Sequence, residues 1–273
     1  MSDRERDPRI ERRMTGHDAS HGHDTGGVPW HGRELSDNPF SGDRGEVDPR
    51  LAAALDGDVD DESLMSAVSA ARFFVPVVAA PGEGAAVGTD SVADMATVVL
   101  TSPDGERALP AFTGLATLAA WDPSARPVPV TAQTLGQAAV QERCDLLVLD
   151  LGSDQHRVLR PSMVYALAQG RAWVPADRDV VVQESIDGGR RVVLAEERLA
   201  GLVQDVRVGG LTPSGELRVD VVVPRGLDRE TLHLVLAEVG RQLSEDAELR
   251  TRIDGLTFSV VAGPGSTQVS PIG

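Results

Sequence analysis

The sequence contains no lysine, and all 26 of its basic residues are arginines. A Schiff base needs a lysine amine, and so does a phosphate-binding loop of the type G-x-x-x-x-G-K-[ST]. The absence of lysine therefore excludes both kinds of chemistry.

Cysteine is almost absent as well, since Cys144 is the single one among 273 residues. One cysteine excludes an intramolecular disulfide and a cysteine-rich metal site. The simplest interpretation of Cys144 is a small buried hydrophobic residue ahead of a strand. Aromatic residues make up 3% of the chain while hydrophobic residues reach 41%, so we expect a core built mainly of Val, Leu and Ala.

Positive charge is also scarce. The formal net charge is −16 at pH 7, and no basic patch is evident, so we expect no nucleic-acid partner. No apolar run approaches the roughly 18 residues that a membrane span needs. The charged N-terminus lacks the apolar segment of a secretory signal. We therefore expect a cytoplasmic protein with no membrane partner and no cofactor.

The N-terminal residues 1–47 are rich in Asp, Arg, Gly and His, which predicts a disordered tail. Its histidines could share a metal ion, although a polar tail without a fixed scaffold is the favoured interpretation. These histidines are His17, His21, His23 and His31. Trp30 and Phe40 are large apolar residues in polar surroundings, and we consider them candidate anchors on the protein's own body or on a partner.

Residues 48–175 are expected to form an α/β domain with a mixed sheet. The Asp-Gly pair at 104–105 predicts a hairpin. The apolar run at 145–150 predicts the most buried strand. Thr113 is expected to cap a helix that ends before Pro123.

Residues 176–264 are expected to form a smaller α+β domain, followed by a flexible end at 265–273. Two apolar stretches flank the sequence Ile-Asp-Gly-Gly at 186–189, which predicts a hairpin, with a helix over residues 192–202 as the alternative. A second hairpin, an amphipathic helix and a last strand at 256–262 follow. This ββαβ order favours a ferredoxin-like fold.

Four blocks of sequence carry a family resemblance and cover most of the chain. They are WHGRELSDNPFSGDRGEVDPRLAAAL, FFVPVV with ADMATVVLTSPDGERALPAFTGLATLAAWDPSARPVPV, CDLLVLDLGSDQHRVLRPSMVYALAQG, and GLDRETLHLVLAEVGRQLSEDAELRTRIDGLTFSVV. They resemble the SseB family, the "enhanced serine sensitivity" proteins, in its actinobacterial form, although Leu151 stands where the pattern has Pro. The resemblance implies an SseB N-terminal domain followed by a smaller C-terminal domain. It implies no accepted reaction, cofactor or catalytic residue.

Two short regions carry side chains that could form a site. The first, on a proline-bounded loop beside a strand edge, comprises Trp121, Asp122 and Arg126. The second follows the end of the buried strand, where α/β proteins often bind ligands, and comprises Asp150, Arg157 and Arg160. The favoured interpretation is structural: a Trp that covers the core, and ion pairs that stabilise the fold.

No catalytic constellation is evident in the sequence. His156 shares a loop with Ser153 and Asp154, but one short loop cannot arrange a triad, and no G-x-S-x-G elbow exists. We therefore expect a non-catalytic protein-interaction or regulatory protein and not an enzyme. The alternative is a small-molecule-binding protein, or an enzyme, that uses residues 150–160.

Overall fold

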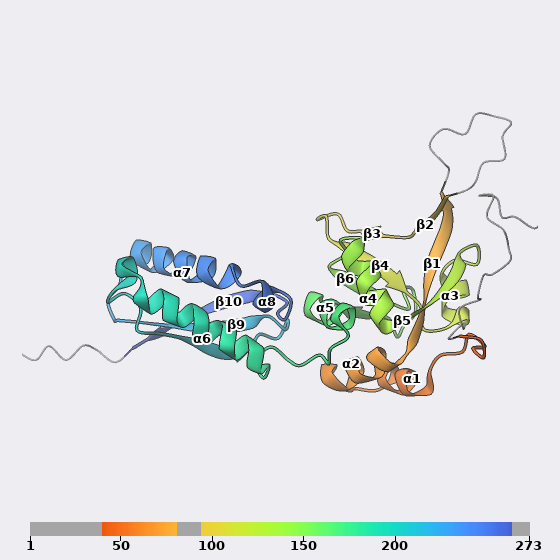
Figure 1. Ribbon diagram of the computed structural model, residues 1–273, viewed down its shortest axis with the longest axis horizontal. Coiled ribbons are helices and arrows are strands. Elements are labelled where there is room, and N and C mark those ends of the chain that lie inside the picture. The colour runs from red at the N-terminus through yellow and green to blue at the C-terminus, as the bar shows by residue number, and fades with distance from the viewer. Residues whose placement is uncertain (1–39, 81–93, 264–273) are drawn as a thin grey trace, which may run out of the picture. The chain divides into compact units, whose positions relative to one another are not determined.

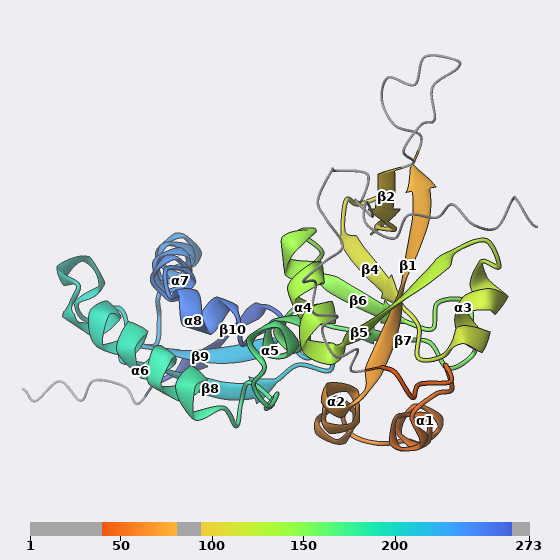
Figure 2. The same cartoon turned by 45° about the vertical axis from the view of Figure 1, so that its right-hand side comes forward.

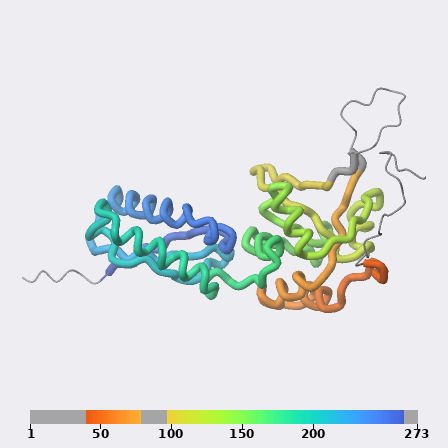
Figure 3. The backbone as a smooth tube through the Cα atoms, in the orientation of Figure 1, coloured from red at the N-terminus to blue at the C-terminus, as the bar shows by residue number. Residues whose placement is uncertain are grey.

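The computed structural model describes residues 40–80 and 94–263 (Figure 1). Trp30, the four tail histidines and the predicted flexible end at 265–273 therefore lie outside the described residues. The described part of residues 44–273 belongs to one compact unit. It contains two groups of elements that follow each other along the chain (Figure 3).

The first group contains five helices and seven strands among the described residues. The helices are α1 (Pro49–Asp56), α2 (Asp61–Ala70), α3 (Leu115–Trp121), α4 (Ala132–Gln141) and α5 (Pro161–Gln169). The strands are β1 (Arg72–Ala80), β2 (Asp94–Thr97), β3 (Leu100–Thr101), β4 (Arg107–Ala111), β5 (Arg126–Thr131), β6 (Leu146–Leu149) and β7 (Arg157–Leu159). Mixed α/β architecture is therefore confirmed.

These strands form two sheets that meet at the end of β4. One sheet has the order β2-β1-β5 and is antiparallel, and the other has the order β3-β4-β6-β7 with β4 parallel to β6. Phe74 of β1 exchanges two backbone hydrogen bonds with Phe112, at 2.8 and 2.9 Å. Figure 2 shows β1 crossing beside β4 at this junction. The predicted hairpin at Gly105 is confirmed by the β3–β4 pairing.

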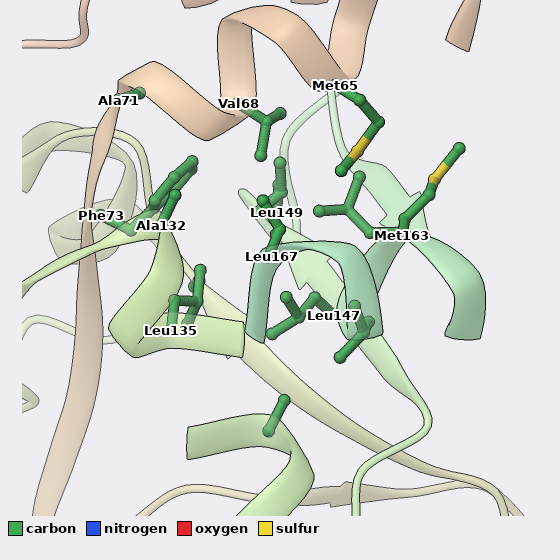
Figure 4. Close-up of a cluster of buried hydrophobic side chains, with 14 of the residues drawn as sticks. Met65, Val68, Ala71, Phe73, Ala132, Leu135, Leu147, Leu149, Met163 and Leu167 are labelled. Carbon is green, nitrogen blue, oxygen red and sulfur yellow. The ribbon is translucent and has the colours of Figure 1, made fainter. Parts of the chain in front are cut away.

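The core of this group lies between the strands and helices α2, α4 and α5 (Figure 4). Leu147 and Leu149 of β6 and Leu135 of α4 are completely buried. The expectation that β6 is the most buried strand is wrong, because its alternate residues Leu146 and Val148 are partly exposed whereas β4 is buried from residue 108 to 111. The parallel neighbour β4 is the strand covered on both faces.

Close approach of α4 and α5 depends on Gly136. A Cβ atom added there would lie 2.5 Å from the backbone nitrogen of Ala168 and 2.8 Å from the Cβ of Leu167. Such distances are impossible for a real side chain, so only glycine permits this helix contact.

Residues 44–47, at the end of the predicted tail, contact the domain directly. The carbonyl of Gly45 accepts a 2.9 Å hydrogen bond from the backbone N–H of Leu115, and Arg72 donates to the carbonyl of Glu46 at 2.5 Å. Gly45 has φ +81°, and a Cβ there would overlap the Leu115 side chain. This segment is therefore part of the folded structure.

The second group forms a three-stranded sheet covered by helices on one face. Its helices are α6 (Val180–Ala195), the 3-10 helix η2 (Glu197–Leu199), α7 (Arg229–Ser244) and α8 (Ala247–Arg250), and its strands are β8 (Asp205–Leu211), β9 (Leu217–Val223) and β10 (Leu256–Ala262). The strand order is β10-β9-β8, with β10 parallel and β8 antiparallel to β9. Buried residues of α6 and α7 pack against alternate residues of β9, from Leu217 to Val223.

The hairpin predicted around residues 186–189 is wrong, because these residues lie inside helix α6. Val182, Ile186 and Val193 share its buried face. Gly189 faces α7, where an added Cβ would lie 2.5 Å from Leu243. The glycine that suggested a turn therefore permits close packing of two helices.

The ferredoxin-like expectation is not confirmed. That fold has four strands in a βαββαβ order, whereas the sheet observed among the described residues has three strands, and α6 occupies the place of the expected first hairpin. The following ββαβ order is confirmed by β8, β9, α7 and β10.

Two aspartates at helix N-termini hold the first turn through their carboxylates. Asp60 accepts from the N–H of Ser63 at 2.7 Å, and Asp228 accepts from the N–H and the hydroxyl of Thr231 at 2.9 and 2.8 Å. Hydrogen bonds of this kind stabilise the ionised form. They lower the pKa of both carboxyls below their usual 3.8.

Low pH should destabilise the protein, because it protonates the carboxylates of Asp60 and Asp228. The folded pKa of each carboxyl is lower than the unfolded value of about 3.9. The stability that these caps contribute is therefore fully present above that value, and it is lost as the pH falls through the folded pKa. Asp228→Asn keeps an oxygen acceptor but cannot be protonated, so it should lose less stability than the parent protein between about pH 5 and pH 2. Urea unfolding followed by circular dichroism measures this, with Asp104→Asn in the β3–β4 turn as control. An unchanged pH dependence in Asp228→Asn would contradict it.

Candidate functional site

Asp150 and Thr113 join the carboxyl ends of the parallel strands β6 and β4. The side chain of Asp150 is buried, and its two oxygens accept from the N–H of Thr113 at 2.8 Å and from its hydroxyl at 2.6 Å. The expectation that Thr113 caps α3 is wrong, since Gly114 holds that position. The Asp150 carboxylate is thus fully engaged within the fold.

Arg157 lies on β7 and faces α1. Its guanidinium donates to the carbonyl of Leu55 at 2.8 Å and to that of His156 at 3.2 Å. The neighbouring Gln155 also reaches α1, through a hydrogen bond to the carboxylate of Asp56. This arginine therefore binds a backbone carbonyl near the C-terminal end of α1.

Arg160 connects three segments. Its Nε donates to Asp254 at 2.7 Å, one Nη donates to Asp61 at 2.9 Å, and the guanidinium lies 5.9 Å from the centre of the Trp173 ring. Burial opposes the charge of Arg160, but the hydrogen bonds that its guanidinium donates to the two carboxylates outweigh this effect and raise its pKa. The second oxygen of Asp254 accepts from the N–H of Ser162 at 2.9 Å.

Asp150, Arg157 and Arg160, which the sequence predicts to share a site, thus have partners on different elements. Asp150 binds Thr113, Arg157 binds the end of α1, and Arg160 binds carboxylates of α2 and of the loop before β10. Each contact connects segments that are distant in sequence.

Trp121 lies at the end of α3 and packs on Phe112, with ring centres 5.2 Å apart and ring planes inclined by 34°. It is only partly buried, and it forms one wall of a pocket of about 280 Å³. The pocket is lined by Ala116, Thr117, Ala120, Trp121, Leu151, Gly152 and Ser153. These residues follow the carboxyl ends of β4 and β6.

The other residues of the predicted loop lie beside this pocket in sequence but do not line it. Asp122 accepts from the N–H of Ser124 at 2.8 Å and from its hydroxyl at 2.6 Å, and the hydroxyl bond contributes most to a lowered pKa of this carboxyl. Arg126 is exposed at the start of β5. Phe40 lies in a turn in which Asp43 donates to its carbonyl at 3.0 Å.

Sequence reasoning missed the pocket wall formed by Leu151, Gly152 and Ser153. The available signal was Leu151, an apolar residue directly after the apolar run at 145–150. Gly152 adopts φ +88° opposite Trp121, which lets the turn after β6 face α3.

Cys144 and His156 each lie close to a carbonyl of the protein's own backbone. Cys144 is buried in the core, as predicted, and burial is the main cause of the raised pKa of its thiol. His156 places Nδ1 3.1 Å from the carbonyl of Ser153. Within residues 40–80 and 94–263, no group of three or more His, Cys, Asp or Glu side chains is placed to hold a metal ion.

In the same part of the chain, no helix has the length and apolar character needed to cross a membrane.

Comparison with known proteins finds one similarity, and it lies in the first group of elements. No curated protein and no solved structure matches the chain. Residues 48–166, which extend from the cap of α1 into α5, match the family model described as the SseB protein N-terminal domain. The resemblance found in the sequence is therefore supported over this segment, which is similar to the SseB protein N-terminal domain and carries the Asp150–Thr113 contact and the Trp121 pocket.

Proposed function

We propose that this chain is a non-catalytic interaction or regulatory protein of the SseB family, of the actinobacterial type, acting in the cytoplasm. In this proposal the elements from α6 to β10 form the SseB-type C-terminal domain, and the contact surface for a protein partner is the Trp121 pocket. The observation that carries it is the contrast between that pocket and the neighbouring polar residues. The polar residues are bound within the fold, while the pocket presents an aromatic wall to solvent.

The chemistry of the pocket supports a protein contact. Its lining is mostly apolar, and Trp121 is held in place by its stacking on Phe112. A rigid aromatic side chain in a concave site is the type of residue that dominates binding energy at protein interfaces.

Filling the pocket should abolish partner binding while leaving the fold intact. Ala120 and Ala119 are adjacent, exposed residues of α3, but only Ala120 lines the pocket. Ala120→Arg should lower recovery of a specific partner from the native source by at least about tenfold, a loss typical of a central interface position. Ala119→Arg, the matched control, should recover it fully.

The readout is quantitative mass spectrometry of proteins that co-purify with each variant. Equal recovery with both variants would reject the pocket as the contact surface. Circular dichroism and thermal unfolding of both variants establish that the comparison concerns binding and not folding.

The alternative function, small-molecule binding or an enzyme activity in the 150–160 region, has one observation in its favour. The Trp121 pocket borders the turn after β6, at the carboxyl ends of two parallel strands, where α/β proteins often bind ligands. A metabolite that raises the melting temperature of the parent protein and of Ala119→Arg, but not of Ala120→Arg, would favour this alternative over a protein partner.

A further inference from the structure

The sheet formed by β8, β9 and β10 has two edges of different character. The β8 edge carries Asp205 and Arg207, and its register shifts between Val208 and Gly210. Charges and irregularities of this kind prevent one sheet edge from pairing with another. The β10 edge is the seven-residue strand LTFSVVA, which has no charge and no proline and pairs with β9 without a shift in register.

The other edge strands among the described residues are protected by length or by proline. β2, β3 and β7 have four, two and three residues. β5 contains Pro127 and Pro129, which cannot donate to an added strand. Within the described sheets, β10 is therefore the edge strand that combines length with a lack of such features.

In β10, the backbone N–H and C=O groups of every second residue point away from β9. The carbonyl of Gly255 accepts from Leu217, and the N–H of Gly263 donates to Val223. In a parallel ladder every second residue bonds to the same neighbour, so the odd-numbered positions face β9. The backbone groups of the even-numbered positions face the edge, where no further strand lies among the described residues. These positions are Leu256, Phe258, Val260 and Ala262.

We propose that two copies of this chain pair through β10, antiparallel and centred on Ser259. Full overlap of two seven-residue strands places Ser259 opposite its equivalent and Val260 opposite Phe258 of the second copy. All even-numbered positions then face even-numbered positions, so each edge-directed backbone group meets a complementary one.

The side chains of β10 favour a second copy of this chain as the partner at this edge. Directly opposed residues of an antiparallel pair project on the same face of the sheet. Phe258 is partly buried on the helix-covered face, whereas Val260 on that face is 43% exposed. Pairing places the exposed Val260 of each copy beside the ring of Phe258 in the other, an aromatic and β-branched pair of the favourable type. The contact is repeated by the two-fold axis, as an isologous interface requires.

The two strands can approach although each chain has a net charge of −16. Repulsion between like charges opposes association, and β10 carries none of these charges. We therefore expect a reversible dimer that becomes stronger at higher salt, where the repulsion is screened.

A cysteine at position 259 tests the register. Opposed residues of this non-hydrogen-bonded type have Cα atoms about 4.5 Å apart, within the range that a disulfide spans. Ser259→Cys in the full chain should give a covalent dimer on mild oxidation. Thr257→Cys on the same strand is the control, because its equivalent would lie about 13 Å away at ~3.3 Å per residue. The native Cys144 is buried in both variants.

A charge at position 260 tests the contact energetically. Val260→Arg should raise the dimer dissociation constant at least about tenfold, since the change occurs twice across the two-fold axis. Val192→Arg, at a similarly exposed valine on α6, should leave it unchanged. Sedimentation equilibrium of the full chain supplies both values, and circular dichroism checks folding.

Three results would overturn the proposal. They are a monomeric parent chain at all concentrations up to hundreds of micromolar, an unaltered dimer in folded Val260→Arg, or a dimer in which Ser259→Cys cross-links no better than Thr257→Cys. If the parent chain dimerises but neither Val260→Arg nor Ser259→Cys behaves as predicted, the dimer uses a different surface.

Discussion

Replacing Asp150 by alanine is expected to destabilise the protein by on the order of 3 kcal/mol. The substitution removes the acceptor of two hydrogen bonds, at 2.8 and 2.6 Å, and leaves the buried N–H and hydroxyl of Thr113 without this partner. Bonds to a charged acceptor contribute about 1.5–3 kcal/mol each, before relaxation. Asp150 also has φ +49°, a conformation that alanine adopts less readily than Asp or Asn.

Asp150→Asn separates these effects. Asparagine tolerates the same backbone conformation, and its amide oxygen can still accept from the Thr113 N–H, so we expect less than about half of the loss seen with alanine. Urea unfolding of both variants gives the free energies. A change of less than about 0.5 kcal/mol in Asp150→Ala, typical of an exposed position, would show that the contact is not structural.

Replacing Arg160 by alanine should cost about 2–3 kcal/mol, because it leaves Asp254 without its cation. Asp254 has a side chain only 8% exposed, while Arg160 is 28% exposed, so solvent screens the pair in part. Arg160→Lys retains the charge but not the fork that reaches both Asp254 and Asp61. We expect it to recover part of the loss.

Arg178 provides the matched control for Arg160. It pairs with Glu62 at 2.9 Å, but both side chains are largely exposed, at 62% and 47%. Exposed pairs of this kind contribute about 0–1 kcal/mol, so Arg178→Ala should leave the free energy of unfolding nearly unchanged. Equal losses in Arg160→Ala and Arg178→Ala would refute the role assigned to Arg160.

Local signals in the sequence identified many of the element boundaries. Asp48 and Thr131 accept first-turn hydrogen bonds of α1 and α4, and both are of residue types that are favoured at helix N-termini. Gly170 ends α5 with φ +65°, the left-handed conformation for which glycine is suited. These features depend on a few adjacent residues, so the local sequence is sufficient to indicate them.

Features that depend on distant neighbours were misjudged. The continuous stretch ATVVLT at 96–101 has the composition of one strand, but it divides between β2 and β3, which belong to different sheets. Gly189 suggested a turn, although its contact with Leu243 of α7 makes it a packing glycine. Periodicity within either stretch carries no information about the opposing surface.

The candidate site shows the same limit. Trp121 was recognised as a surface residue of interest, but its pocket is completed by Leu151 and Ser153, about 30 residues further along the chain. Asp150 was grouped with Arg157 and Arg160 because they are close in sequence, whereas their partners lie on different elements. Only the folded arrangement distinguishes a shared site from three separate structural contacts.

Hydrogen exchange of the full chain, with and without its co-purifying partner, tests the proposed contact surface most directly. If the Trp121 pocket binds the partner, amides of residues 115–121 and 151–153 should exchange more slowly in the complex. The same experiment with Ala120→Arg should show no protection at the same partner concentration. Protection confined to other elements, with these two segments unchanged, would contradict the proposal that this protein acts through the Trp121 pocket.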